Sequence, residues 1–301
     1  PEAYEFYLKA KHKYEKRKNI DDTEIVRGLL EKSIEIDDNL LISKNLLGQT
    51  YFYEGEYVKS MEIFSTTLKQ AETLGDKYEM GNSLNKIGQI NFQKAEHDNA
   101  LEYYEKSLAI AEKLDMKDLA ATNFDAIAGI YYNKGNYNKA LDLVQRALKI
   151  DEEIGRKSGI ATRLGNIGMI YKIKGEMNIA LKYYQKENKI VDELGNNSRK
   201  GQIYGKIGET YHLMGSYEKA LDYFKKSLFT REELGDKKGI GLSLYSLGKI
   251  FYDMGNYNKA VELLEKSFSI LSKMGFKKLE LIIIVYLNLS YMKLKKVINL
   301  D

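Results

Sequence analysis

The stretch KGNYNKAL occupies residues 134–141, and close variants of it return farther along the chain. GSYEKAL stands at 215–221 and GNYNKAV at 255–261. A glycine ends a helix readily because it adopts a left-handed conformation without a Cβ clash, and Asn or Ser beside it helps to start the next helix. Each copy therefore predicts a tight turn between two helices.

A 40-residue period extends this pattern over most of the sequence. One small residue, each time directly after Leu or Ile, marks the period at Gly48, Gly88, Ala128, Gly168, Gly208 and Gly248. Apolar residues around these positions recur at three- and four-residue spacing, the period of an amphipathic helix. A bulky residue follows later in each repeat, at Phe64, Tyr104, Val144, Tyr184, Phe224 and Leu264. The sequence thus predicts tandem helix hairpins in which a small residue on the first helix allows close packing.

The composition supports a folded, helical chain and narrows the classes of partner. Hydrophobic residues make up 44% of the 301 residues, and there is one proline. The absence of cysteine excludes disulfides and thiolate zinc sites and favours a reducing, cytoplasmic location. The formal charge of +4, from 47 basic and 43 acidic residues, gives no electrostatic case for nucleic acid or an anionic membrane. The longest apolar run, 281–287, is far too short to span a bilayer.

The order Leu-Gly-x-x-Tyr, Gly-x-Tyr-x-x-Ala and x-x-x-Phe resembles the tetratricopeptide repeat. The 40-residue period and the LGD sequences at 74–76 and 234–236 are most similar to the long-helix variety. That variety occurs in kinesin light chains, Pins-type scaffolds and sensory regions of bacterial signalling proteins. The resemblance implies an all-α fold, a right-handed superhelical solenoid of about seven antiparallel helix hairpins. The proline that the family usually places after the second helix is missing, and glycine replaces it.

The two ends of the chain differ from the middle. We expect a shorter N-terminal hairpin over 1–39, six 40-residue hairpins over 40–275, and a C-terminal helix over 276–301 without a second helix to cover it. The chain starts at Pro1 rather than Met, which suggests a piece of a longer protein. The last helix is either a simple cap or is covered by further sequence or by a second copy, as a homodimer. Its candidate self-association residues are Ile282, Ile283, Val285 and Tyr286.

No arrangement of residues predicts catalysis. The three histidines, His12, His97 and His212, lie in different repeats and at different repeat positions. No zinc-protease, phosphate-loop or serine-hydrolase motif is present. We therefore expect no catalytic residues, no metal site and no cofactor, and the chain is predicted not to be an enzyme.

The resemblance implies that the first helices line a concave groove that holds a partner. Asn166 lies in RLGNIGMIY, which resembles the context of the Asn that long repeats use to hold a ligand's main chain. Side-chain amides suit this role because they donate and accept hydrogen bonds at once. A solvated helix face that carries such residues by chance is the alternative. The candidates for partner binding are Asn45, Gln49, Asn85, Gln89, Asp125, Tyr132, Asn166, Lys172, Lys206, Glu209, His212, Tyr245 and Lys249.

Two functions are consistent with these features. The first is a non-catalytic scaffold that binds a protein or peptide segment in the groove. The alternative is a sensory or regulatory module of a multidomain bacterial signalling protein, such as a cyclase, a kinase or a transcription regulator. Such a module would bind a peptide or its own output domain, and Rap-type peptide receptors are an analogy that rests on fold alone.

Overall fold

The structure, a computed structural model, describes residues 1–16 and 20–298. Within them the predicted all-α order of helix hairpins is confirmed. The helices are α1 (Glu2–Lys16), α2 (Ile20–Ile36), α3 (Leu41–Tyr53), α4 (Tyr57–Leu74), α5 (Lys77–Gln93), α6 (His97–Lys113), α7 (Lys117–Asn133), α8 (Tyr137–Glu153), α9 (Lys157–Ile173), α10 (Met177–Glu193), α11 (Asn197–Leu213), α12 (Tyr217–Glu233), α13 (Lys237–Asp253), α14 (Tyr257–Ser272) and α15 (Lys277–Ile298). Residues 17–19 of the expected first hairpin and 299–301 of the expected last helix lie outside the described residues.

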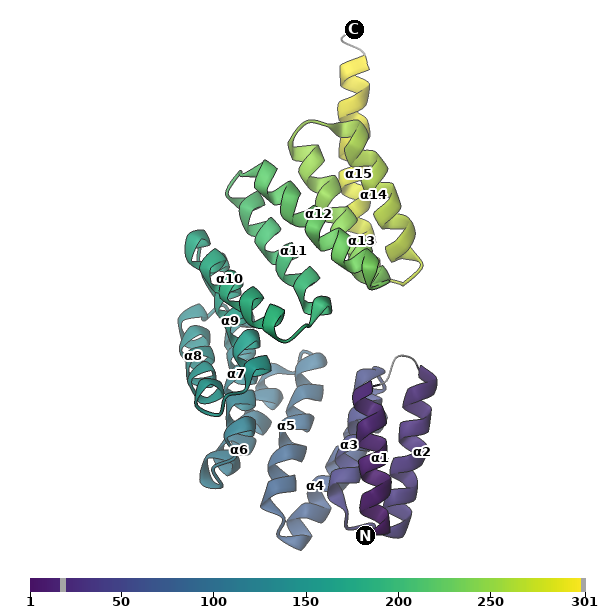
Figure 1. Ribbon diagram of the computed structural model, residues 1–301, viewed down its shortest axis with the longest axis vertical. Helices are drawn as coiled ribbons and strands as arrows, with labels where there is room; N and C mark the ends of the chain where they lie inside the picture. The colour runs from purple at the N-terminus through teal and green to yellow at the C-terminus, as the bar shows by residue number, and fades with distance from the viewer. Residues whose placement is uncertain (17–19, 299–301) are drawn as a thin grey trace. The chain divides into compact units, whose positions relative to one another are not determined.

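The helices form two compact units, shown in purple to teal and in teal to yellow (Figure 1). Unit 1, Pro1–Gly155, contains α1 to α8, and unit 2 starts at Arg156 and contains α9 to α15. In each unit every helix packs on the next one along the chain. The first helices of successive hairpins also touch, as α1, α3, α5 and α7 do in unit 1 and α11, α13 and α15 do in unit 2. In each unit, the surface that these first helices form together is called the first-helix face.

A residue with positive φ separates consecutive helices at 20-residue intervals from Gly55 onwards. Gly135, at the centre of KGNYNKAL, has φ 75° and ends α7. Ala95 and Asp115 fill the same place before and after α6, with φ of 61° and 52°. Side chains directly after several of these residues then cap the next helix by accepting a bond from the N–H group three residues ahead. These caps are Asp76, Asn136, Asn196, Asp236 and Asn256.

A close contact between the two helices of a hairpin follows from the small residue of the repeat. A Cβ atom added at Gly208 would lie 2.7 Å from Cδ1 of Phe224. Such an approach is shorter than carbon atoms tolerate, so α11 and α12 pack this closely only because Gly208 has no side chain. The hairpin α7–α8 instead pairs Ala128 with the smaller Val144, both of them buried.

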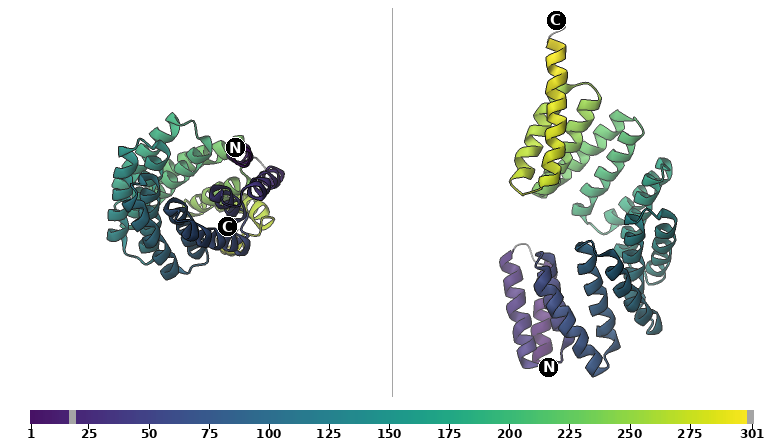
Figure 2. Two further views of the ribbon diagram at one scale, coloured as in Figure 1. Left: turned by 90° about the horizontal axis from the view of Figure 1, so that it is seen from below. Right: turned by 180° about the vertical axis from the view of Figure 1, so that it is seen from behind.

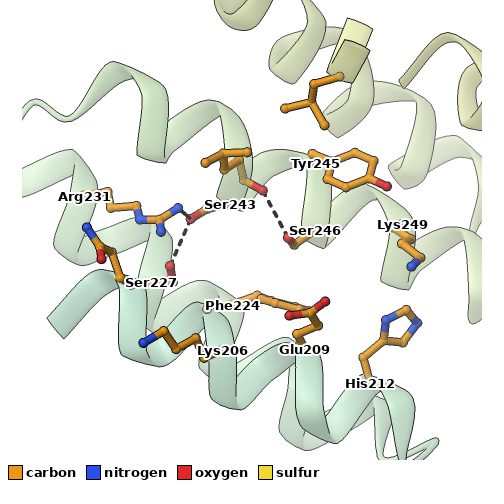
Figure 3. Close-up of a pocket in the computed structure, with 14 residues that line it drawn as sticks. Lys206, Glu209, His212, Phe224, Ser227, Arg231, Ser243, Tyr245, Ser246 and Lys249 are labelled. Carbon is orange, nitrogen blue, oxygen red and sulfur yellow. Dashed lines mark hydrogen bonds between the residues drawn. The ribbon is translucent and has the colours of Figure 1, made fainter. Parts of the chain in front are cut away.

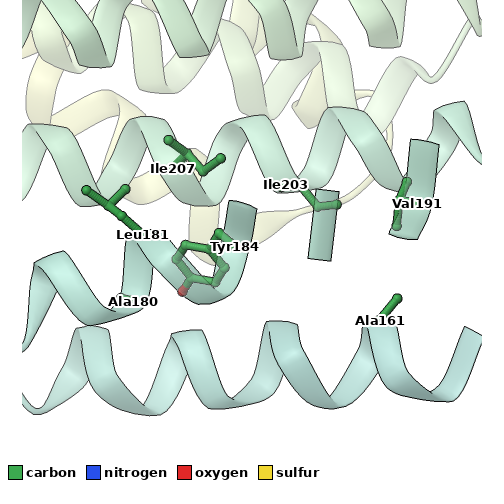
Figure 4. Close-up of a cluster of buried hydrophobic side chains, with 7 residues drawn as sticks. All are labelled: Ala161, Ala180, Leu181, Tyr184, Val191, Ile203 and Ile207. Atoms are coloured by element: carbon green, nitrogen blue, oxygen red, sulfur yellow. The ribbon is translucent and has the colours of Figure 1, made fainter. Parts of the chain in front are cut away.

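The interior of unit 2 shows how one hairpin packs on the next (Figure 4). The ring of Tyr184, on α10, is fully buried and lies in a cluster with Ile203 and Ile207 from α11. Ala161 from α9 and Val191 from α10 close the same cluster. Because three helices contribute to this cluster, the hairpin α9–α10 completes the burial of its apolar side chains in contact with α11.

The last helix of the described residues, α15, packs within unit 2. The right view of Figure 2 shows α15, in yellow, beside the final hairpin, and it contacts α14 and α13. Ile283 is fully buried against the α14 cluster, and the ring of Tyr286 meets those of Tyr245 and Tyr252 edge-on. Two of the four predicted self-association residues, Ile283 and Tyr286, therefore belong to the interior packing of this chain.

The contact between Gly208 and Phe224 gives a direct test of this packing. Gly208→Ala is expected to lower the free energy of unfolding by about 1–3 kcal/mol because the added methyl group overpacks the contact. Phe224→Val alone also destabilises, since it leaves a cavity. The double variant reproduces the Ala128–Val144 pair, so its cost should fall below the sum by at least about 0.5 kcal/mol in urea unfolding.

Gly28→Ala is the matched control, because a Cβ atom added at Gly28 on α2 meets nothing within 4 Å. It should stabilise the protein by up to about 1 kcal/mol through helix propensity. Additive effects at Gly208 and Phe224 would show that the small residue does not set the helix spacing.

Candidate functional site

Unit 2 holds a pocket of about 300 Å³ on its first-helix face (Figure 3). α11 contributes five lining residues, α13 contributes five, and α12 forms the floor between them. The lining residues are Gln202, Gly205, Lys206, Glu209, His212, Phe224, Ser227, Arg231, Leu242, Ser243, Tyr245, Ser246, Lys249 and Leu279. The volume lies at the lower end of the range for small-ligand pockets, which suits one or two side chains of a bound segment.

Ion pairs tie the first helices of unit 2 together beside this pocket. Lys172 on α9 lies 2.6 Å from a carboxylate oxygen of Glu209 on α11. His212 on α11 lies 2.6 Å from a carboxylate oxygen of Asp253 on α13. These contacts hold the side chains that border the pocket, and Lys172 partly neutralises the charge of Glu209.

The pocket is positively charged where it meets α12. Lys206 shares the buried carboxylate of Glu187 with Arg199, at 3.3 Å and 2.9 Å. Burial lowers the pKa of the Lys206 ammonium group, and the nearby Glu187 partly offsets that effect. Arg231, only 9% exposed, lines the pocket from α12 and has no ion pair among the described residues.

Unit 1 has a pocket of about 340 Å³ on its own first-helix face. The residues that line it come from α1, α3 and α5, and they are Tyr7, Lys11, Tyr14, Glu15, Ile42, Asn45, Leu46, Gln49, Glu79, Asn82 and Lys86. Glu79 is 4% exposed and accepts hydrogen bonds from the side-chain amides of Asn45 and Asn82. Burial raises the pKa of the Glu79 carboxyl, and these two bonds partly offset the effect.

Lys86 is the exceptional cation of the unit 1 pocket. It is half-buried on α5, and within residues 1–16 and 20–298 its ammonium group has neither an ion pair nor a hydrogen bond. Burial lowers the pKa of Lys86 to about 8. A cation in this position lowers the stability of the free protein and is available to an acidic group.

The same repeat positions line both pockets. Counted from the small residue of the first helix, they are six, three and two residues before it and one residue after it. In α3 these are Ile42, Asn45, Leu46 and Gln49, and in α11 they are Gln202, Gly205, Lys206 and Glu209. The repeat therefore places variable side chains at equivalent points of both first-helix faces.

The structure brings seven of the thirteen predicted binding residues into these pockets. Asn45 and Gln49 line the pocket of unit 1, and the others line that of unit 2, namely Lys206, Glu209, His212, Tyr245 and Lys249. Gln89, Asp125, Tyr132, Asn166 and Lys172 are half-buried on first helices but line neither pocket. Their role in binding stays a prediction.

Asn85 lies inside unit 1 rather than on its surface. It is 2% exposed, donates to Oδ1 of Asn123 at 2.8 Å and accepts from the amide of Gln89 at 2.8 Å. Asn123 in turn donates to Oγ of Ser107. This closed chain of amides joins α5, α6 and α7, so Asn85 stabilises hairpin stacking.

The exposed apolar residues of α15 form the remaining candidate surface for self-association. Ile282 and Val285 are 45% and 54% exposed, whereas Ile283 and Tyr286 pack inward. Self-association through this helix stays a prediction.

Two searches of the described residues bear on other classes of site. Across residues 1–16 and 20–298, no three His, Cys, Asp or Glu side chains cluster in a way that would hold a metal ion. Over the same part of the chain, no helix has the length and apolar character needed to cross a membrane.

Sequence reasoning missed the second-helix and interior contributions to the pockets. Arg231 occupies a position that holds Ala71, Ala111, Val191 and Leu271 in other hairpins and the buried Asp151 in α8, so a basic residue at a core position was the available signal. Lys86 stands two residues before Gly88, where α3 carries Leu46. The lack of an ion pair to Lys86 among the described residues, although Glu15 and Glu79 line the same pocket, depends on packing that the sequence does not display.

Comparison with protein families gives a match to one family model, which fits three segments of the chain. The family model described as tetratricopeptide repeat matches residues 39–113, 118–190 and 199–273. The comparison with curated proteins gives no match. No catalytic family is indicated.

Solved structures with a similar fold come from several kinds of protein. A signal-transduction ATPase with a tetratricopeptide repeat sensor from Pyrococcus horikoshii has a TM-score of 0.75 at 19% identity. The similarity covers 97% of this chain but only 43% of that one. The apo form of RapI has a TM-score of 0.66 at 17% identity, with 91% and 99% covered. BtubC from P. vanneervenii has a TM-score of 0.64 at 21% identity, with 73% and 92% covered. At these identities the likeness shows the fold alone.

The pKa of Lys86 predicts how stability changes with pH. The folded state holds the Lys86 proton less tightly than the unfolded state, whose lysine pKa is near 10.4, so protonated Lys86 lowers stability below about pH 8. This cost disappears as the pH rises from about 8 towards 10. Lys86→Met should therefore raise the free energy of unfolding by about 1–3 kcal/mol at pH 7, and the difference should shrink by about pH 9.5.

Urea unfolding of wild type and variant at both pH values measures this difference. Lys225→Met, at an exposed site on α12, is the control and should change stability by less than about 0.5 kcal/mol at either pH. A constant difference between wild type and Lys86→Met from pH 7 to 9.5 would contradict the assigned burial of the charge.

Proposed function

The chain belongs to the tetratricopeptide repeat family, and we propose that it is a non-catalytic scaffold that binds an extended segment of a protein or a peptide on its first-helix faces. Tandem hairpins present long surfaces on which a partner segment contacts several repeats at once. Such binding needs positioned hydrogen-bonding groups and small pockets rather than catalytic groups.

The observation that carries the proposal is the recurrence of pocket-lining positions in both units. Each pocket combines a side-chain amide, an aromatic ring and at least one cation, as with Asn45, Tyr7 and Lys86 in unit 1. Amides can pair with the main chain of an extended segment, while the rings and the pocket volume accept its side chains. The outer surfaces of the second helices instead carry exposed charged side chains such as Glu105, Lys149 and Lys225.

A structural neighbour supports a binding role of this kind. A Rap protein with a TM-score of 0.63 at 15% identity was solved in complex with Competence and Sporulation Factor. The similarity covers 98% of this chain and 99% of the Rap protein. A chain of this fold and length is therefore sufficient to hold a partner.

A sensory role within a larger signalling protein is the alternative that we propose. The ATPase from Pyrococcus horikoshii carries its tetratricopeptide repeats as a sensor, and this chain spans less than half of that protein. In this alternative the faces bind a peptide or an output domain, and binding changes the arrangement of the helices. For both roles we propose a cytoplasmic location, which the absence of cysteine from the sequence favours.

Selection from a random peptide display library, followed by affinity measurement on the full chain, tests binding. A first-helix variant combines Gln49→Ala, Gln202→Ala and Lys249→Ala, which remove pocket-lining groups from both units. It should weaken the dissociation constant of selected peptides at least about tenfold, or 1.4 kcal/mol, if these groups contact the peptide.

The matched control combines Glu105→Ala, Lys149→Ala and Lys225→Ala on second helices, and it should leave affinity within about twofold because those side chains lie off the faces. Equal affinities of the first-helix variant and wild type would exclude the first-helix faces as the binding surface. Small-angle scattering with and without a selected peptide separates the two roles, since a sensor changes its radius of gyration on binding and a rigid scaffold does not.

A further inference from the structure

We propose that the unit 2 pocket is a receptor for a carboxylate group of the bound segment, with the Arg231 guanidinium as its anchor. This inference rests on the proposed peptide-binding function and adds the chemistry of one recognised group. Three observations support it. Arg231 is buried without an ion pair, Gly205 beside it has no side chain, and most charged groups that line the pocket are positive.

Arg231 is a buried cation that forms no ion pair with any described residue. It is 9% exposed, and its hydrogen bonds run from Nη1 to the carbonyl oxygen of Gly239 at 2.7 Å and to Oγ of Ser243 at 3.1 Å. Nε has no acceptor within the described part of the chain, and Nη2 forms no hydrogen bond there either. The nearest carboxylate influence comes from Asp236, whose side chain caps α13 by accepting from the Gly239 N–H group. Burial lowers the pKa of the Arg231 guanidinium, although an arginine remains charged at neutral pH.

An unpaired charge is expensive to bury, and the cost falls when a ligand supplies the opposite charge. A carboxylate oxygen suits Nη2, because this donor makes no hydrogen bond within the described part of the chain and, unlike Nε, is not a buried atom. The free Nη2 donor of Arg231 therefore favours an anionic group over a neutral one.

Two glycines one turn apart on α11 lie beside the guanidinium, and only the second of them, Gly205, borders the pocket. A Cβ atom added at Gly201 would lie 3.5 Å from Nε of Arg231, and one added at Gly205 would lie 3.9 Å from Nη2. Gly205 lines the pocket, so the missing side chain leaves the guanidinium open to it. At the equivalent position α3, α5, α7 and α13 carry Asn45, Asn85, Asp125 and Tyr245.

The hairpin α9–α10 has the same glycine without the same opening. Its Gly165 faces the buried carboxylate of Glu187, whose Oε2 atom would lie 2.6 Å from an added Cβ atom. Glu187 is neutralised by Arg199 and Lys206. The opening and the unmatched charge thus coincide at Gly205 and Arg231.

In unit 1, side chains of the protein fill the space that is equivalent to the opening beside Gly205. There Asn85 bonds to Asn123, and Asn123 bonds to Ser107, which closes the space between α5, α6 and α7. The three equivalent residues in unit 2 are Gly205, Ser243 and Ser227, all of them smaller or equal in size. Arg231 replaces the equivalent Ala111 and adds the charge.

The groups around the opening favour a negative ligand. Lys206 and Lys249 line the same pocket as Arg231, and the single lining carboxylate, Glu209, is paired with Lys172. Figure 3 shows Arg231 reaching from α12 towards Ser243, with Lys206 and Glu209 on α11. Such a pocket attracts a carboxylate and orients it towards the guanidinium.

The experiment follows the side-chain Nε–Hε NMR signal of Arg231 in the full chain, assigned by its loss in Arg231→Leu. The probes are the peptides Ac-Ala-Ala-Glu-Ala-Ala-NH2, Ac-Ala-Ala-Gln-Ala-Ala-NH2 and Ac-Ala-Ala-Ala-Ala-Ala-OH, together with inorganic phosphate. The Glu peptide presents a side-chain carboxylate and the free acid a terminal one, so they distinguish the two sources. We expect a saturable shift with at least one of them and none with the Gln peptide.

Two variants copied from other hairpins of this chain serve as tests of the site. Arg231→Leu takes the residue of Leu271, and Gly205→Asn takes the residue of Asn85. Each should weaken binding of the responsive peptide at least about tenfold in calorimetry. Lys225→Gln removes an exposed cation from α12 and should leave binding within about twofold.

Several results would overturn the inference. They are the lack of a saturable shift with either carboxylate peptide, an equal response to the Gln peptide, a response to phosphate alone, and unchanged binding in Gly205→Asn when Arg231→Leu fails to fold. If the affinity of selected peptides falls in the first-helix variant but not in Arg231→Leu, only this inference is wrong. If their affinity is unchanged in both variants, the proposed function is wrong as well.

Discussion

One close contact sets the geometry of the 40-residue hairpins. It joins a small residue on the first helix to a bulky residue on the second helix of the same hairpin. Where the first helix carries Gly208, the second presents Phe224 at a distance that a Cβ atom would not allow. Where it carries Ala128, the second presents Val144. Since the contact recurs every 40 residues, the remaining positions of each first helix fall at equivalent places, either inside a unit or on its first-helix face.

This constraint explains why function lies away from the most recognisable sequence. KGNYNKAL and its copies form turns in which a left-handed glycine and an Asn cap join two helices. The residues that line the pockets occupy positions that the packing leaves free, so they differ among repeats. Lys86 in unit 1 and Arg231 in unit 2 are the clearest cases, because each is a cation with no carboxylate partner among the described residues.

The sequence alone was sufficient for the fold because the determining signals are local and periodic. Small residues, helix caps and apolar spacing can be recognised within 40 residues, and the helix order agrees with them. The candidate site was only partly predictable, since exposure depends on neighbours from other hairpins. Asn85 looks like Asn45 in sequence, yet Asn123 and Ser107 enclose it. Arg231 lies on a second helix, and its place in the pocket depends on packing against α11 that the sequence does not display.

The central claim is that the first-helix faces bind a peptide and that unit 2 recognises one of its carboxylate groups. A crystal structure of the full chain with a selected acidic peptide tests this claim most directly. The account predicts the peptide along the first helices, with a carboxylate oxygen within hydrogen-bond distance of the Arg231 guanidinium and beside Gly205. A peptide bound along the second helices, or a carboxylate held elsewhere with Arg231 still unpaired, would contradict it.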